Sequence, residues 1–204
     1  MLKAVVAILV VCATLAASAV EIKFDLSSAT GGALPDGFAS RVSGLGRPGD
    51  WKVVDEIIPR TFAPFITNGP TPTAKHSVFA QTSQDATAGA ASLLLYTNEI
   101  LKNFTLTTRV KIVTPGSEPA AGVVFRAQDE SNYYVVRAST DGNLLWYRVV
   151  AGVRHETTGV GVRVPIATNT WQDLKLECDG NRIRCFLNGQ LMIPPAKPGA
   201  PTGD

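Results

Sequence analysis

Charged residues are scarce in this 204-residue chain and balanced in sign, with 19 Lys and Arg against 17 Asp and Glu. A nucleic acid or an anionic membrane surface selects a clear excess of basic side chains. The near balance therefore gives no support to nucleic acid as a partner, nor to a negatively charged membrane.

Long apolar runs are missing except at the N-terminus. Residues 4–16 are apolar with one exception, Lys3 places a positive charge before them, and Ala17-Ser18-Ala19 is the small-x-small pattern that signal peptidase accepts. The run is shorter than the ~20 residues that a membrane-spanning helix needs. We therefore expect residues 1–19 to be a signal peptide. The mature chain, beginning at Val20, is expected to lack a membrane span and to be periplasmic or extracellular.

Cysteine is rare, and of three residues one leaves with the signal peptide. Gly180-Asn181 is a turn signal between two alternating runs, and a hairpin there makes Cys178 and Cys185 diagonal neighbours on the core face. The predicted pairs are Cys178 with Ile183, Leu176 with Cys185, and Leu174 with Leu187. Two interpretations stay open. Diagonal positions fit disulfide geometry poorly and favour two buried thiols, whereas an oxidising compartment permits a disulfide.

Amphipathic helical patterns are absent, and short β-branched and aromatic runs alternate with Gly, Pro, Asn and Asp. This pattern predicts one all-β domain over residues 20–193, a two-sheet antiparallel β-sandwich. The predicted strands are Glu21–Leu26, Trp51–Asp55, Ser77–Thr82, Ser92–Tyr96, Asn103–Val113, Ala121–Arg126, Tyr133–Ser139, Leu144–Ala151, Trp171–Cys178 and Ile183–Leu187.

Three segments are predicted to lie outside the strands. Pro59 to Lys75 is rich in proline, which cannot donate to a sheet ladder. Gly159–Gly161 is interpreted as a loop, and residues 194–204, rich in Pro and Gly, as a disordered tail. By contrast, Val123–Phe125 and Tyr133–Val136 are apolar on both faces. That predicts central strands covered on both sides, or an outer face that binds something.

The stretch AAGVVFRAQDESNYYVVRAS resembles the middle of a family of bacterial secreted β-sandwich proteins, the 3-keto-disaccharide hydrolase-like or LamG-like domains. The family pattern falls on Gly122–Arg126, Asp129 and Asn132–Arg137. The segments DGNLLWYRVVAGVRHE and NTWQDLKLECDGNRIRCFLNGQ are similar to the hairpins that follow it. The resemblance implies a concanavalin A-like lectin/glucanase jelly roll. Relatives continue past the last hairpin into closing strands, and we expect these to be lacking here or replaced by another segment.

Catalytic signatures are missing as well. The chain has no Glu-x-Asp-x-x-Glu strand of laminarinase type, no G-x-S-x-G elbow, no P-loop and no dinucleotide fingerprint. Asp129-Glu130 is an adjacent carboxylate pair of the kind found in solvated turns, not one spaced for glycoside hydrolysis. Elimination beside a keto group would need a base and an electrophile or metal. The sequence assigns none of these catalytic residues, predicts no cofactor and no metal ligand set, and leaves a structural calcium open.

A sugar-facing surface is the candidate site that the residues do support. Aromatic rings present a flat apolar face to sugar C–H groups, and Arg and His donate to hydroxyls. In the alternative interpretation the aromatic rings pack in the core, the arginine stems cover the sheet, and the histidine is a surface residue at a strand end. The candidates are Arg126, Tyr133, Arg137, Trp146, Arg148 and His155.

Three functions follow from these patterns. An exported module that binds carbohydrate without catalysis is favoured, and carbohydrate is the expected partner. A hydrolase acting on glycosides or 3-keto-disaccharides is the second hypothesis, and a structural or protein-interaction domain is the third. All three rest on a fold that hosts many functions. The oligomeric state is left open.

Overall fold

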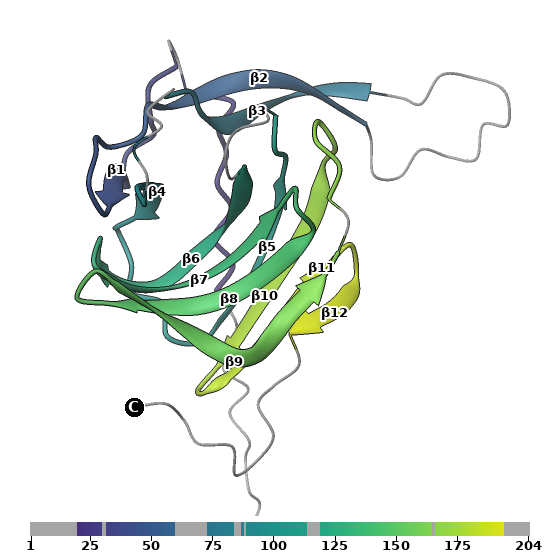
Figure 1. Ribbon diagram of the computed structural model, residues 1–204. Helices are drawn as coiled ribbons and strands as arrows, with labels where there is room; N and C mark the ends of the chain where they lie inside the picture. Colours follow the sequence, from purple (N-terminus) through teal and green to yellow (C-terminus); the bar gives the residue numbers. More distant parts are fainter. Residues whose placement is uncertain are drawn as a thin grey trace, which may run out of the picture.

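The computed structural model describes residues 20–29, 32–59, 73–83, 87, 89–113, 119–164 and 166–193, and within these ranges every regular element is a β-strand (Figure 1). The predicted signal peptide, the predicted tail and residues 60–72 of the predicted proline-rich loop lie outside them. The strands are β1 Phe38–Ser43, β2 Trp51–Pro59, β3 Thr73–Gln81, β4 Ala91–Tyr96, β5 Phe104–Val110, β6 Ala120–Asp129, β7 Asn132–Ser139, β8 Asn143–Val150, β9 Val153–Arg163, β10 Gln172–Asp179, β11 Arg182–Leu187 and β12 Gln190–Ile193.

Two four-stranded antiparallel sheets form the body of the domain. One, called here the front sheet, has the order β6-β7-β8-β9, and the other, the back sheet, has the order β12-β11-β10-β5. Apolar side chains from both sheets meet in one core cluster that includes Val136, Leu144, Leu176 and Leu187. The predicted all-β antiparallel sandwich is confirmed. Two further antiparallel pairs, β1-β4 and β2-β3, complete the described fold.

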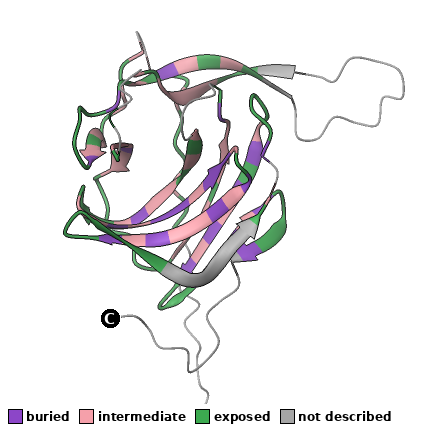
Figure 2. Cartoon of the chain, in the orientation of Figure 1, coloured by how far each residue is buried: buried purple, intermediate pink, exposed green. Residues whose placement is uncertain are grey.

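The front sheet is covered on both faces, because alternate residues of its central strands enter different clusters. Val136 and Leu144 belong to the core shared with the back sheet. Val135 and Tyr147, which point to the other face, pack with Leu93 of β4 in a second cluster. Figure 2 shows buried positions distributed along β7 and β8 in agreement with this double packing. The expectation of central strands covered on both sides is thus confirmed.

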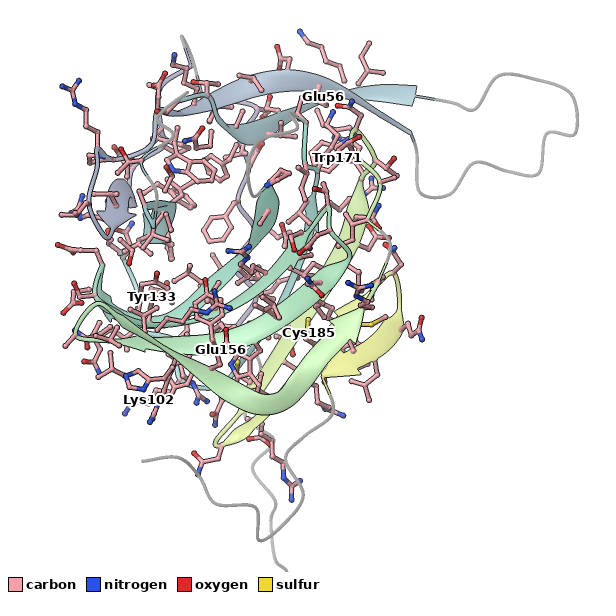
Figure 3. The ribbon with its side chains drawn as sticks, in the orientation of Figure 1. Glu56, Lys102, Tyr133, Glu156, Trp171 and Cys185 are labelled. Carbon is pink, nitrogen blue, oxygen red and sulfur yellow. The ribbon has the colours of Figure 1, made fainter. Side chains whose placement is uncertain are left out.

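The β2-β3 pair is attached to the sandwich through a charged contact. Glu56 of β2 forms an ion pair with Lys111, which follows β5, and the Lys111 side chain is largely buried. The Lys111 ammonium also lies 5.1 Å from the centroid of the Trp171 ring. Glu56 and Trp171 lie near each other at the top of Figure 3. A desolvated pair over an aromatic ring is stronger than one in water, so it fixes this hairpin to the body.

Three sequence predictions of secondary structure are wrong. Glu21–Leu26 forms no strand; instead Phe24 packs against Phe38 and Tyr96, with ring centroids 5.1 and 4.9 Å away. Gly159–Gly161 is part of β9, where Gly161 pairs with Leu145, so partner strands override the weak strand preference of glycine. Residues 59 and 73–75, predicted as loop, pair in β2 and β3 because a proline at a strand end loses no ladder bond. Strands β1, β9 and β12 were also not predicted.

The register of the β10-β11 hairpin is confirmed at every predicted pair: Cys178 with Ile183, Leu176 with Cys185, and Leu174 with Leu187. Both cysteines are buried free thiols, as the diagonal geometry favours. Burial raises the pKa of the Cys178 thiol, an effect that the nearby positive charge of Arg126 opposes. Burial raises the pKa of the Cys185 thiol to about 12.

The raised pKa of Cys185 predicts a loss of stability at high pH. The unfolded thiol ionises near its ordinary pKa of 9, whereas the folded thiol keeps its proton to about 12. Its contribution is therefore fully present below pH 9 and is lost as the pH rises toward the folded pKa. We expect the free energy of unfolding, measured with urea between about pH 8 and about pH 11, to fall less steeply in Cys185→Ala than in the wild type. Equal slopes would contradict the assignment.

Candidate functional site

Arg126 lies at a β-bulge where the chain leaves its regular register with β7, between Phe125 and Asp129. Its backbone has φ of 50°, a conformation that costs a non-glycine residue energy and that surrounding contacts must hold. The guanidinium donates to the carbonyl oxygen of Gly180 in the β10-β11 turn. Arg126 therefore connects one end of the front sheet to the back sheet.

Trp146, Arg148 and His155 share the face of the front sheet that is turned toward the back sheet. Trp146 packs against the main core cluster. Arg148 pairs with Tyr134 on one side and with His155 on the other. His155 is exposed near the start of β9. Arg148 and His155 are therefore cross-strand neighbours, and Trp146 is the next residue of β8 on the same face. They lie at the end of the sandwich where Arg126 contacts Gly180.

Tyr133 and Arg137 lie on the opposite face of the front sheet. Tyr133 is 5% exposed, packs with Leu93 and shares a hydrogen bond with Ser43 of β1. Burial raises the pKa of its phenol more than the Ser43 hydroxyl lowers it, so Tyr133 is neutral near pH 7. The structure thus divides the six candidate residues between two faces and one connecting bulge, and does not unite them in one surface.

Further polar residues join Tyr133 and Arg137 on their face. Tyr147 pairs with Glu156 across β8 and β9, and Val149 pairs with Arg154. The guanidinium of Arg154 lies 4.0 Å from the centre of the Tyr147 ring, and its Nη2 atom lies 2.9 Å from the Glu156 carboxylate. We call Tyr133, Arg137, Tyr147, Arg154 and Glu156 the polar face. Of these, Tyr133 and Glu156 are labelled in Figure 3.

The sequence contained a signal for the part of the polar face that was missed. A two-residue turn at Ala151-Gly152, with φ of 48° and 77°, joins β8 to β9. This is the left-handed turn that tight hairpins require. Counting back from it pairs Tyr147 with Glu156 directly. Ala-Gly is a weaker turn signal than Asn-Gly, so β9 was not predicted and its side chains were not assigned a face.

Arg137 has one cross-strand neighbour without a side chain on the polar face. Its partner in β6 is Gly122, which has no side chain, and its partner in β8 is Leu145. Asp141 in the β7-β8 turn supplies a negative charge nearby. Hydrogen bonds from Ser139 and Asn143 hold the pKa of Asp141 below its usual value, and the charge of Arg137 adds to this. Asp141 therefore stays ionised near neutral pH, close to Arg137.

The polar face is suited to binding hydroxylated molecules. Its exposed members, Arg154 and Glu156, supply a guanidinium donor and a carboxylate acceptor. Among the described residues, no three His, Cys, Asp or Glu side chains form a group that could hold a metal ion. Nor do we find in them a helix of the length and apolar character that a bilayer crossing requires.

Comparison with known families places the chain in one of them. The model of the 3-keto-α-glucoside-1,2-lyase-like domain family matches residues 31–204. The chain belongs to this family. The resemblance found in the strands from Gly122 to Arg137 is thereby confirmed. Curated protein sequences give no match.

One solved structure with a detectable likeness is the carbohydrate-binding module CBM66 from Bacillus subtilis. The identity is 21% and the TM-score 0.47, over 52% of this chain. The chain matches 65% of that module, slightly under two thirds of its length.

Proposed function

We propose that this family member is a carbohydrate-binding module that holds a sugar on the polar face of its front sheet. The observation that carries the proposal is the Arg154 group: a guanidinium 4.0 Å over the Tyr147 ring and 2.9 Å from Glu156, on the same face as Arg137. Stacking and pairing orient the guanidinium before a ligand arrives. Preordered donors lose little entropy when they bind hydroxyl groups.

Charge supports a ligand that is neutral and rich in hydroxyls. Arg154 is matched by Glu156, and Asp141 lies near Arg137, so the local charges largely cancel. A free anion would meet these carboxylates, whereas a sugar can donate to a carboxylate and accept from a guanidinium at once. The Tyr147 ring is buried beneath the Arg154 guanidinium and holds that guanidinium in place.

A panel of sugars tests the proposal. The full protein is melted alone and with gluco-, fructo- and manno-oligosaccharides and with 3-keto-disaccharides. A ligand that binds only the folded state stabilises it by ~2.7 kcal/mol at a hundredfold excess over its dissociation constant. We expect one sugar class to raise the melting temperature. If no sugar does so, the structural or protein-interaction hypothesis is favoured instead.

The family description favours a second candidate, elimination on a 3-keto-glucoside. Glu156 is the carboxylate of the polar face and lies beside Arg154. In this reaction Glu156 takes the C2 proton, whose acidity the C3 ketone raises, and Arg154 neutralises the enolate oxygen. The C1–O bond then breaks, a C1=C2 double bond forms, and the leaving oxygen takes the proton that Glu156 removed, which restores the carboxylate.

Turnover separates the two candidates. A lyase releases the leaving sugar from a 3-keto-disaccharide and forms a conjugated enone that absorbs in the ultraviolet. Glu156→Gln should then abolish product while the substrate still binds, because the amide cannot take the proton. A shift in melting temperature without product favours the binding module.

We also propose that the protein is exported. The support is the N-terminal pattern of Lys3, the apolar run and Ala17-Ser18-Ala19. We expect the intact mass of the exported protein to correspond to a chain that begins at Val20. Recovery of the uncleaved chain in the cytoplasm would contradict the proposal.

A further inference from the structure

We propose a second sugar-binding site on the outer face of the back sheet, independent of the polar face. A groove of about 340 Å³ lies there and is lined by Thr107, Asp173, Leu174, Lys175, Phe186 and Gly189. Its volume lies at the lower end of the range of small-molecule sites. The groove opens away from the core that the two sheets share.

Register explains how the groove is built. Lys175 of β10 pairs with Thr107 of β5 on one side and with Phe186 of β11 on the other, so these side chains form a row across the sheet. Phe186 is a large apolar ring on the outer face, where polar residues are the rule. The Lys175 ammonium lies 5.3 Å from the ring centroid and leaves the ring partly exposed.

The rim of the groove is fixed before a ligand binds. Asn188 and Gly189 form the β11-β12 turn, with φ of 49° and 80°. The Asn188 side chain accepts from the backbone N–H of Asp173 at 2.9 Å and donates to Gln172 Oε1 at 2.7 Å. The turn is thus held against β10 by two side-chain hydrogen bonds. A fixed rim reduces the ordering cost of binding.

Charge pairing selects the class of ligand. On this face Arg109 pairs with Asp173 at 2.9 Å, and Glu177 pairs with both Lys175 and Arg184 at 2.6 Å. The cations therefore already have partners, and the Asp173 carboxylate lines the groove. Inorganic anions and acidic sugars would be repelled by Asp173. A neutral pyranose can place its C–H face on Phe186 and its hydroxyls against Asp173, Lys175 and Thr107.

The ligand class is the one proposed for the polar face, but the residues differ, so the two sites can be tested separately. Maltohexaose, laminarihexaose and cellohexaose serve as neutral probes, with oligogalacturonate as the acidic comparison. Titration measures the dissociation constant, and amide NMR shifts map the contacts. Phe186→Ala removes the ring. Leu191→Ala is the matched control, since Leu191 is an exposed apolar residue of the same sheet that does not line the groove.

We expect a neutral hexaose to shift the amides of residues 173–175 and 186–189, and Phe186→Ala to weaken that binding by about tenfold while Leu191→Ala does not. Binding lost in Arg154→Ala but unchanged in Phe186→Ala would overturn the second site and leave the proposed function standing. Binding lost in Phe186→Ala but unchanged in Arg154→Ala would support the second site and overturn the polar face. Failure of every neutral probe to shift these amides, or equal binding of oligogalacturonate, would overturn the second site.

Discussion

Gly122→Ala is expected to lower the melting temperature by about 6–12 °C. An added Cβ would lie 2.0 Å from the carbonyl oxygen of Val136 and 2.7 Å from the Cα atom of Arg137. Both atoms belong to the backbone of β7, so no side-chain rotation can relieve the contact. Strands β6 and β7 must separate, and overpacking of this kind costs about 3 kcal/mol. For a domain of this size each kcal/mol shifts the melting temperature by roughly 2–4 °C.

The control is Gly152→Asn in the β8-β9 turn. No atom lies within 4 Å of a Cβ at Gly152, and its φ of 77° is one that asparagine tolerates. This variant should stay within about 1 kcal/mol of the wild type. Calorimetry measures the melting temperature of both variants. Similar, small losses in the two variants would show that β6 and β7 do not approach as closely as described.

Leu176→Ala is expected to be the most damaging truncation in the core, at about 2–5 kcal/mol. Leu176 is 1% exposed and lies in the middle of β10, between Leu106 of β5 and Cys185 of β11. Neighbouring strands lie on both sides of β10, so the surrounding atoms can move only slightly into the cavity that the substitution leaves. The expected observation is a large fall in the urea midpoint with an unchanged slope.

Leu191→Ala is the matched comparison for Leu176→Ala. Leu191 is 44% exposed, and the same truncation there should change stability by less than about 1 kcal/mol. If the two variants lost equal stability, the core would not lie between the two sheets as the burial pattern indicates.

The sequence was sufficient for the β10-β11 hairpin because its signals are local. Gly180-Asn181 sets the turn, and the alternation on either side of it places Leu174, Leu176 and Cys178 on the core face, as found. Side chains alternate between the two faces of a strand, so a shift of the pairing by one residue would turn the apolar residues out of the core. The double coverage of β7 was likewise predictable, from the apolar run that begins at Tyr133.

The candidate site was harder to predict, since it depends on which face each strand turns to a neighbour. Tyr133 and Trp146 have the same aromatic character in sequence, yet Tyr133 packs toward β4 and Trp146 toward the back sheet. Glu156 and Arg154 lie on β9, whose glycines conceal its strand character. The site role of the six sequence candidates stays a prediction. Their division between two faces became visible only once β8 and β9 were paired.

Binding on the polar face is tested most directly by titrating the sugar that raises the melting temperature into three proteins: wild type, Arg154→Ala and Arg182→Ala. Arg182 is an exposed arginine of β11, outside the polar face, and controls for the loss of one positive charge. A hydrogen bond to a charged group contributes about 1.5–3 kcal/mol. We predict that Arg154→Ala weakens binding by about tenfold or more while Arg182→Ala binds as the wild type does. Equal affinity in all three proteins would contradict the placement of the sugar on this face.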